Sequence, residues 1–390
     1  MQFGTGTASS ARIIFWLAAL LLFYVYAGYP LLLALIGAFV RRPRPEPGYC
    51  PRISVLIAAY NEEEAIERKI RQTLALEYPA DKLEVLVLSD CSSDRTDEIV
   101  TAFPDSRVRL VRLPERGGKT LAQNYGVKQA TGEIVVFSDA TAIYQAKALL
   151  YLACNYQDAS VGAVSGRYQY FDPTEQSATG LGSVAFWNYE NLIKTLQSRI
   201  RTITGCCGCI YSVRKTAYTE LPGDIISDLV QPLQAIRKGY RVVFEDRALA
   251  YEETTQSTSE EFSMRVRVVT RAMRGLLSVS DLLQPWKFAW PAFQLWSHKI
   301  MRWMVPLFLI VLFAANSMLL DVPLYRAALG LQLFFYAAAV LNMLLPLHRQ
   351  WKPLGIPLFF CTLNAAALVS MIEICRGRKY VTWQTVRARR

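Results

Sequence analysis

Two apolar, strand-like runs of this sequence end in carboxylates, and these are the first residues that could do chemistry. Residues 134–137 lead to Asp139, and residues 84–88 lead to Asp90. In an open parallel sheet, ligands bind in the crevice outside the carboxyl ends of the strands. We therefore predict that Asp139 is a functional residue and that Asp90 lies near it.

A glycine-rich segment and a lysine lie close to these carboxylates in the sequence. Residues 117–120 (GGKT) end like a P-loop, but the first glycine of that motif would stand at position 113, which is Leu113. No GxGxxG fingerprint follows a predicted strand either. Two acidic strand ends, a helix amino terminus and Lys119 suit a metal-bound diphosphate with a polar base or ribose nearby.

Strand-like and helix-like segments alternate through this part of the chain. The β-rich run 53–59 is followed by Asn61, which we expect to cap a helix with three glutamates in its first turn. Ser92 and Ser93 could cap a second helix, over residues 94–103. Further elements are a strand over 108–113 and a helix over about 119–129. The alternation predicts an α/β fold with a doubly wound, mostly parallel sheet.

Long apolar segments flank this α/β region. Residues 12–40 form one apolar run and three more follow between about 304 and 374, each long enough, at roughly 20 residues, to span a bilayer. Arg41, Arg42 and Arg44 follow the first run, which favours an anchor with a cytoplasmic carboxyl end over a cleaved signal peptide. The sequence therefore predicts a multi-pass protein of the cell (inner) membrane with a cytoplasmic domain.

The predicted organisation has five parts. They are an anchor and basic linker (1–50), an aqueous domain (51–280), an amphipathic interface segment (281–302), three transmembrane helices (303–375) and a basic tail (376–390). Four crossings would place the tail outside, whereas its basic residues favour the inside. A re-entrant last segment and an outside tail both stay open.

The net charge and the cysteine content restrict the kinds of molecule or ion that the chain could bind. Much of the net charge of +11 lies beside the apolar segments, which indicates lipid head groups and not nucleic acid. The eight cysteines form no two CxxC pairs and the chain has only two histidines, so a structural zinc site is not expected. We interpret the run 205–209 (GCCGC) as small residues that allow close packing.

Six motifs in order carry a resemblance to a known family. They are PRISVLIAAYNEE (51–63), LVLSDCSSDRT (86–96), RGGKTLAQNYGV (116–127), GEIVVFSDAT (132–141), GCCGCIYSVRK (205–215) and ISDLVQPLQAIRKGYRVVFED (226–246). Together they resemble the membrane-integrated family 2 glycosyltransferases, relatives of cellulose, hyaluronan and chitin synthases. The resemblance covers almost the whole chain and implies a GT-A fold inserted between transmembrane helices.

The resemblance also implies a nucleotide-sugar donor site. Tyr60 and Glu62 would border the nucleotide, Asp90 would bind the uracil, and Lys119 would approach the base or the phosphates. Asp139 would be the first acid of a DxD motif that holds a divalent metal, Mg or Mn, on the diphosphate.

Asp228 lies near the start of a predicted helix that ends at Gly239. A carboxylate there could simply cap the helix. Inverting glycosyl transfer needs a carboxylate that accepts the proton of the acceptor hydroxyl as its oxygen attacks the anomeric carbon. The resemblance implies this catalytic role for Asp228.

The chain departs from the family pattern at two places. The DxD motif reads Asp139-Ala140-Thr141, so the second metal ligand, Thr141, is neutral and weaker. The QRxRW pattern reads MRVRV (264–268), which keeps Arg265 and Arg267 but loses Gln and Trp. Arg267 and Arg271, with Arg274, share a helical face. These three could neutralise the leaving diphosphate or rest on lipid head groups. We predict that Arg265, Arg267 and Arg271 bind the donor.

An aromatic and acidic cluster before the GCCGC run is a candidate acceptor site, although interface packing would explain it as well. The acceptor residues that we predict are Trp187, Glu190, Gly205 and Cys206. The predicted function is inverting transfer of a sugar, UDP-linked in the donor, to a glycan in extracellular polysaccharide synthesis. A homo-oligomer or an export partner would fit that function. The alternatives are single-sugar transfer to a polyprenyl or other lipid, and a non-catalytic membrane scaffold or transport partner.

Overall fold

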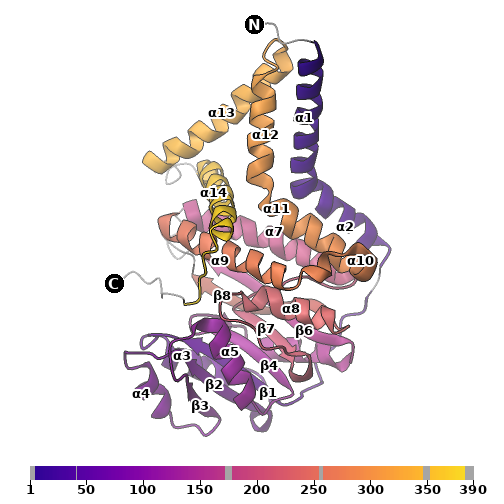
Figure 1. The fold of residues 1–390 in the computed structure, drawn as a ribbon. Helices are drawn as coiled ribbons and strands as arrows, with labels where there is room; N and C mark the ends of the chain where they lie inside the picture. Colours follow the sequence, from indigo (N-terminus) through magenta and orange to yellow (C-terminus); the bar gives the residue numbers. More distant parts are fainter. Residues whose placement is uncertain (1–4, 41, 172–177, 254–257, 346–351, 383–390) are drawn as a thin grey trace.

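The computed structural model describes residues 5–40, 42–171, 178–253, 258–345 and 352–382. In Figure 1 an α/β domain lies below a layer of long helices, and helices α1, α12 and α13 extend away from it. The α/β fold predicted from the sequence is confirmed.

The domain is built on one eight-stranded sheet with the order β3-β2-β1-β4-β7-β6-β8-β5. Strands β3, β2, β1 and β4 are parallel neighbours, β7 is antiparallel to both β4 and β6, and β6 and β8 are parallel. The sheet is thus mixed, with its parallel half at the amino-terminal end of the chain. The strands are β1 (Ile53–Ala59), β2 (Leu83–Ser89), β3 (Val108–Arg112), β4 (Ile134–Asp139), β5 (Ile143–Tyr144), β6 (Val161–Phe171), β7 (Ile210–Arg214) and β8 (Arg241–Glu253).

The helices of the domain connect these strands or cover them. Because β1 pairs with both β2 and β4, the residues at the carboxyl ends of these strands, Tyr60, Asp90 and Asp139, share one edge as predicted. The helices are α3 (Ile66–Leu74), α4 (Thr96–Thr101), α5 (Gly118–Gln129), α6 (Ala148–Cys154), α7 (Ala178–Ile200), α8 (Ser227–Arg237) and α9 (Thr258–Ser278).

The predicted helix caps were wrong. Helix α3 begins at Ile66 and not directly after Asn61, which has a left-handed backbone with φ of 54°. The Asn61 side-chain oxygen accepts a hydrogen bond from the Ser93 amide at 2.8 Å, and Ser92 Oγ accepts one from the Asn61 amide at 3.2 Å. These polar side chains therefore tie the loops after β1 and β2 to each other, and α4 begins later, at Thr96.

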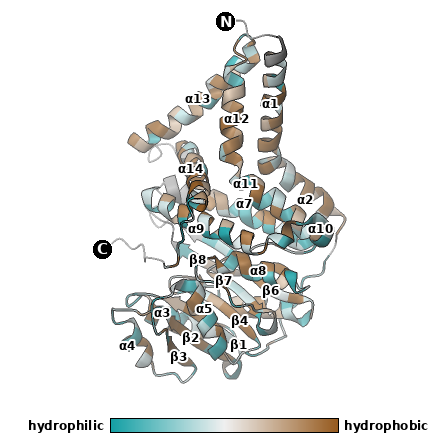
Figure 2. Cartoon of the chain, in the orientation of Figure 1, coloured by the Kyte–Doolittle hydropathy of each residue, from teal (hydrophilic) through white to brown (hydrophobic). Residues whose placement is uncertain are grey.

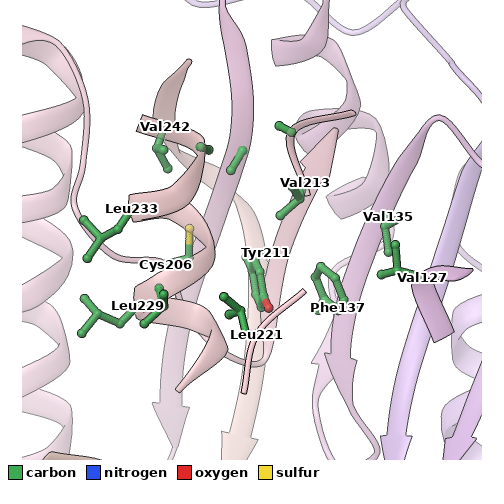
Figure 3. Packing of buried hydrophobic residues seen from close by; sticks show 14 of the residues in the cluster. Val127, Val135, Phe137, Cys206, Tyr211, Val213, Leu221, Leu229, Leu233 and Val242 are labelled. Atoms are coloured by element: carbon green, nitrogen blue, oxygen red, sulfur yellow. The ribbon is translucent and has the colours of Figure 1, made fainter. Parts of the chain in front are cut away.

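Apolar packing on one face of the sheet fixes helix α8. Phe137 of β4 and Tyr211 of β7 stack with ring centroids 4.7 Å apart. Leu229 and Leu233 of α8 belong to the same buried cluster (Figure 3). This packing positions the first turn of α8, which carries Asp228, beside the end of β4.

Gly126 lets α5 approach the sheet closely. A Cβ atom at this position would lie 2.5 Å from a Leu88 methyl carbon and 2.9 Å from one of Leu56. We expect Gly126→Ala to destabilise the protein by about 1–3 kcal/mol, because a methyl group would overpack this contact. Thermal unfolding in detergent measures the effect. Gly48→Ala is the matched control, since no atom lies within 4 Å of its added methyl group; equal melting temperatures for the two variants would contradict the prediction.

Within the described part of the chain, three helices are long and apolar enough to cross a membrane, and a bent pair adds a fourth if it counts as one span. They are the continuous segment Ala8–Ala38, which includes most of α1 (Thr5–Phe23) and all of α2 (Tyr29–Ala38), then α13 (Pro323–Leu344) and α14 (Gly355–Cys375). The bent pair joins Pro285–Trp303, which contains α10 (Pro285–Gln294) and α11 (Met301–Trp303), to α12 (Val305–Ser317) at 58°. Hydrophobic residues dominate α1, α12 and α13 in Figure 2.

The apolar helix α12, which the sequence predicts to be a complete transmembrane span, is shorter than expected. Helix α12 has 13 residues, which is about 20 Å at 1.5 Å per residue and less than a bilayer core of about 30 Å. The count of four crossings therefore requires the bent segment before α12.

The first part of the basic tail lies against the α/β domain. Lys379 Nζ is 3.8 Å from an Asp224 carboxylate oxygen, and a side chain at Gly118 would collide with the Val381 carbonyl oxygen. Residues 376–382 therefore lie on the same side of the apolar helices as the α/β domain, and whether that side is inside or outside stays a prediction. The reason is that α14 packs beside α7 and α9, next to the domain, and returns the chain to it.

Candidate active site

One cavity of about 1480 Å³ extends from the end of β4 to helix α14. Lys119, Asp139 and Asp228 line it at the sheet, and Phe359 and Leu363 line it at α14. The cavity therefore joins the polar strand ends to a helix that is apolar enough to enter a membrane.

Lys119 is bound to Asp139 at the sheet end of this cavity. Its Nζ atom contacts Asp139 Oδ1 and also donates to the Gly208 carbonyl oxygen at 3.3 Å. Burial by itself would lower the pKa of Lys119, but the charge and hydrogen bond of Asp139, together with the charge of Asp228, raise that pKa above its ordinary value. Lys119 is thus a permanent cation where the resemblance places the donor phosphates.

Asp228 lies across the same cavity from Asp139. It stands in the first turn of α8, but the cap position belongs to Ile226 and no side chain caps the helix, so the simple capping role is excluded. A side chain at Gly208 would collide with the Asp228 carboxylate. Burial raises the pKa of Asp228 against the opposing effect of Lys119 and Lys194. A raised pKa makes this carboxylate a better proton acceptor.

Of the three residues predicted to contact the nucleotide, only one lines the cavity. Glu62 lines the cavity, whereas Tyr60 and Asp90 are not among its lining residues. The Asp90 side chain is fully buried and accepts hydrogen bonds from the amides of Gly117, at 2.7 Å, and Gly118, at 3.0 Å. Asp90 therefore holds the amino terminus of α5 in place, and its contact with uracil stays a prediction.

The three arginines that share a face of α9 have different partners in the structure. Arg271 donates to the Ile225 carbonyl at 2.7 Å and to Thr120 Oγ1 at 2.9 Å, and Arg274 pairs with Asp224. Arg267 lines the cavity without a hydrogen bond or ion pair to any described residue. The helix packs against α8 and α14 and so does not rest on head groups along this face. Of this set, Arg267 is best placed to meet a phosphate.

Arg265 lies where the cavity approaches the membrane helices. It pairs with Glu261 at 2.7 Å, and its guanidinium lies 4.7 Å from the centre of the Phe186 ring. Arg302 lies 4.8 Å from the same ring centre. The donor-binding role predicted for Arg265 would require it to exchange the Glu261 carboxylate for a phosphate.

All four predicted acceptor residues line the cavity. Trp187 makes an edge contact with Tyr168 at 4.8 Å between ring centroids, and Glu190 is 3.1 Å from His298 Nε2. Gly205 and Cys206 line the cavity next to Asp228, because the Cys206 amide donates a hydrogen bond to the Asp228 carbonyl oxygen at 2.8 Å. The three cysteines of the GCCGC run are free thiols and are buried.

Comparison with known proteins agrees with this geometry. Residues 54–221, which hold every predicted donor residue before α8, match Glycosyl transferase family 2. The chain carries a glycosyl transferase family 2 domain. The family resemblance predicted from the six motifs is thereby confirmed.

Relatives of the family 2 domain match about half of this chain. The poly-β-1,6-N-acetyl-D-glucosamine synthase of Staphylococcus aureus is 30% identical over 225 residues, which are 55% of this chain and 53% of that protein. Probable glycosyltransferase YdaM of Bacillus subtilis is 26% identical over 227 residues, 56% of this chain and 54% of its own length. The chain spans about half the length of the curated relatives it matches.

A solved structure extends the likeness in fold beyond the family 2 domain. A mannosyltransferase from Pyrobaculum calidifontis, solved with GDP-Man and Mn²⁺, superposes with a TM-score of 0.70. The match covers 94% of this chain and 99% of that one, at 22% identity. The GT-A fold with flanking helices is therefore shared over nearly the whole chain.

Sequence reasoning missed an acidic residue of the α/β domain that lies beyond the residues matched to the family. Glu252, near the end of β8, lines the cavity and accepts a hydrogen bond from Thr141 Oγ1 at 2.6 Å and one from Tyr168 at 2.5 Å. Burial raises the pKa of Glu252, and the Asp139 carboxylate raises it further. The signal that could have found it is the one that found Asp139, an apolar strand that ends in a carboxylate.

The donor set at this place fits a divalent ion only in part. Within the described residues, no group of three or more His, Cys, Asp or Glu side chains could hold a metal. Asp139 and Glu252 supply hard carboxylate oxygens, which Mg²⁺ and Mn²⁺ prefer, and Thr141 is tied to Glu252. A metal here would need oxygens from the donor diphosphate to complete its coordination.

Proposed function

We propose that this chain transfers a sugar, with inversion, from a UDP-linked donor to a glycan acceptor at the cytoplasmic face of the cell membrane, in extracellular polysaccharide synthesis. The observation that supports this best is the cavity described above, because it brings the predicted donor residues Lys119 and Asp139, the Asp228 carboxylate and helix α14 into one space. The relationship to a poly-β-1,6-N-acetyl-D-glucosamine synthase supports the polysaccharide role.

Asp228 has the central chemical role in this proposal. The oxygen of the acceptor hydroxyl forms a bond to the anomeric carbon while its proton passes to the Asp228 carboxylate. The bond from the anomeric carbon to the diphosphate breaks at the same time, and its electron pair stays on the diphosphate oxygen. Lys119 and Arg267 stabilise the negative charge that develops there.

Asp139 and Glu252 would hold the divalent ion together with the diphosphate, while Thr141 orients Glu252. When bound, the ion would supply further positive charge to the leaving group. Mg²⁺ and Mn²⁺ both satisfy the oxygen ligands, and the comparison structure contains Mn²⁺.

A lipid acceptor is the second candidate, and one observation favours it. The cavity reaches Phe359, Phe360 and Leu363 of α14, where an apolar chain would be better accommodated than a sugar. For a glycan product, the three or four spans of one chain would need a homo-oligomer or an export partner to complete a channel.

The test is an assay of the purified full-length chain in lipid nanodiscs with a panel of nucleotide sugars and Mg²⁺ or Mn²⁺. We expect nucleotide release from a UDP-sugar that depends on an added acceptor. Product in the aqueous phase would support a glycan acceptor, and product in the organic phase a lipid. If no donor is turned over with either acceptor class, the proposal is wrong and the non-catalytic scaffold becomes the better interpretation.

A further inference from the structure

Cations outnumber carboxylates in the part of the cavity nearest the membrane helices. Lys194 of α7, Lys299 and Arg302 line this part, and Glu190 is the acidic residue among them. Glu190 contacts Arg302 and lies 3.1 Å from His298 Nε2. Three basic side chains therefore gather beside the Glu190 carboxylate, and we call Lys194, Lys299 and Arg302 the cationic collar.

Two ammonium groups of the collar have no carboxylate partner among the described residues. Lys194, whose exposed fraction is 4%, donates to Cys207 Sγ at 3.0 Å and lies 5.4 Å from the centre of the Trp187 ring. Lys299 makes no hydrogen bond or ion pair within residues 5–40, 42–171, 178–253, 258–345 and 352–382, and its Nζ atom faces Gly205. A buried excess of positive charge is costly unless an anion compensates for it.

The walls beside the collar are apolar and belong to membrane helices. Ile356, Phe359, Phe360 and Leu363 of α14 line this end of the cavity, and Trp303 at the end of α11 lines it as well. On its other side the collar faces Gly205, Cys206 and Asp228. The order along the cavity is therefore an apolar wall, a ring of cations and then the predicted catalytic carboxylate.

We infer that the cationic collar binds the phosphate of a membrane lipid acceptor, a polyprenyl chain that carries a phosphate or a phosphate-linked saccharide. The polyprenyl chain packs against α14, the phosphate lies between Lys194, Lys299 and Arg302, and the reacting oxygen of the acceptor faces Asp228. This inference rests on the glycosyl transfer proposed above and names the class of the lipid acceptor that was given there as the second candidate. Neither the Arg265–Glu261 pair nor the residues predicted to bind the donor take part in it.

The test measures lipid binding and not turnover. The full-length chain in phosphatidylcholine nanodiscs is titrated with a polyprenyl phosphate, with the same polyprenol lacking phosphate, and with phosphatidylglycerol. We expect the polyprenyl phosphate to bind at least about 10-fold tighter than the other two, because charge-assisted hydrogen bonds to phosphate are lost in both. Equal binding of the polyprenol, or of phosphatidylglycerol, would overturn the inference.

Substitutions of single lysines test whether the phosphate binds at the cationic collar. Lys299→Met should weaken polyprenyl phosphate binding by about 10-fold, and Lys299→Arg should keep most of it, since the charge is retained. Lys287→Met is the matched control, because Lys287 lies in the same interface segment but is exposed and outside the cavity. Equal losses in the Lys287 and Lys299 variants would indicate a general surface attraction and refute the collar.

The outcome is independent of the proposed activity. If Lys194→Met fails to fold because Lys194 is buried, Lys299→Met and the comparison of the three lipids still decide. If the chain releases nucleotide with a soluble glycan but shows no preference for the polyprenyl phosphate, the inference fails and the proposed function stands. If the chain prefers the polyprenyl phosphate but releases no nucleotide with any donor, the inference stands and the proposed function fails.

Discussion

Asp228→Asn is expected to reduce turnover by about 10²-fold or more and to leave donor binding nearly intact. The amide has almost the shape of the carboxylate, so the packing over Gly208 is kept, but it cannot accept the acceptor proton. Burial raises the pKa of Asp228, which strengthens the carboxylate as a base and makes its loss costly. Steady-state nucleotide release and nucleotide binding by calorimetry measure the two effects separately.

Asp224→Asn is the matched control for this experiment. Asp224 lies four residues earlier in the chain, pairs with Arg274 at 3.1 Å and does not line the cavity. Its variant should retain turnover within a few-fold of wild type, roughly the scale of one partly exposed ion pair. Wild-type turnover in Asp228→Asn would remove the base from the mechanism. With a lipid phosphate acceptor, that result would show that an ionised phosphate oxygen attacks without a base.

Asp139→Ala should abolish the metal-dependent part of donor binding. Asp139 provides a hard carboxylate oxygen in the cavity, and its neighbour Thr141 offers only a hydroxyl that is already bonded to Glu252. The variant also releases Lys119 from its ion pair, and a free lysine attracts diphosphate by itself. The readout is therefore Mn²⁺ bound per nucleotide, followed by electron paramagnetic resonance, and not nucleotide affinity alone.

The neighbouring substitutions rank the ligands of the metal. Thr141→Ala should weaken Mn²⁺ binding modestly, because a neutral hydroxyl contributes little to a hard cation, while Glu252→Gln should weaken it more. Complete and equal losses from Asp139→Ala and Thr141→Ala would show that this ranking is wrong. Donor binding that is unchanged by a chelator would exclude the metal from binding altogether.

Local patterns in the sequence were sufficient to predict which residues stand at the ends of the strands. An apolar run that stops at a carboxylate is a feature of a few consecutive residues, so Asp139 and Asp90 could be placed at one edge before any contact was known. The lengths of the apolar segments and the six motifs likewise needed no tertiary information. The helix caps could not be predicted in this way, because Asn61 and Ser93 form a hydrogen bond to each other across two loops and not to the helices that follow them.

The tertiary structure decided which distant residues share the cavity. Glu252 is bonded to Thr141, which lies 111 residues earlier, because β8 and β4 both end beside the cavity. Lys194 and Lys299 come from two helices that meet only when the domain packs against the membrane segments. Likewise, α14 returns the tail to Gly118 because it packs on α7 and α9. Periodicity encodes which face of an element is buried, but not which other element covers it, so the composition of the cavity became known only from the folded chain.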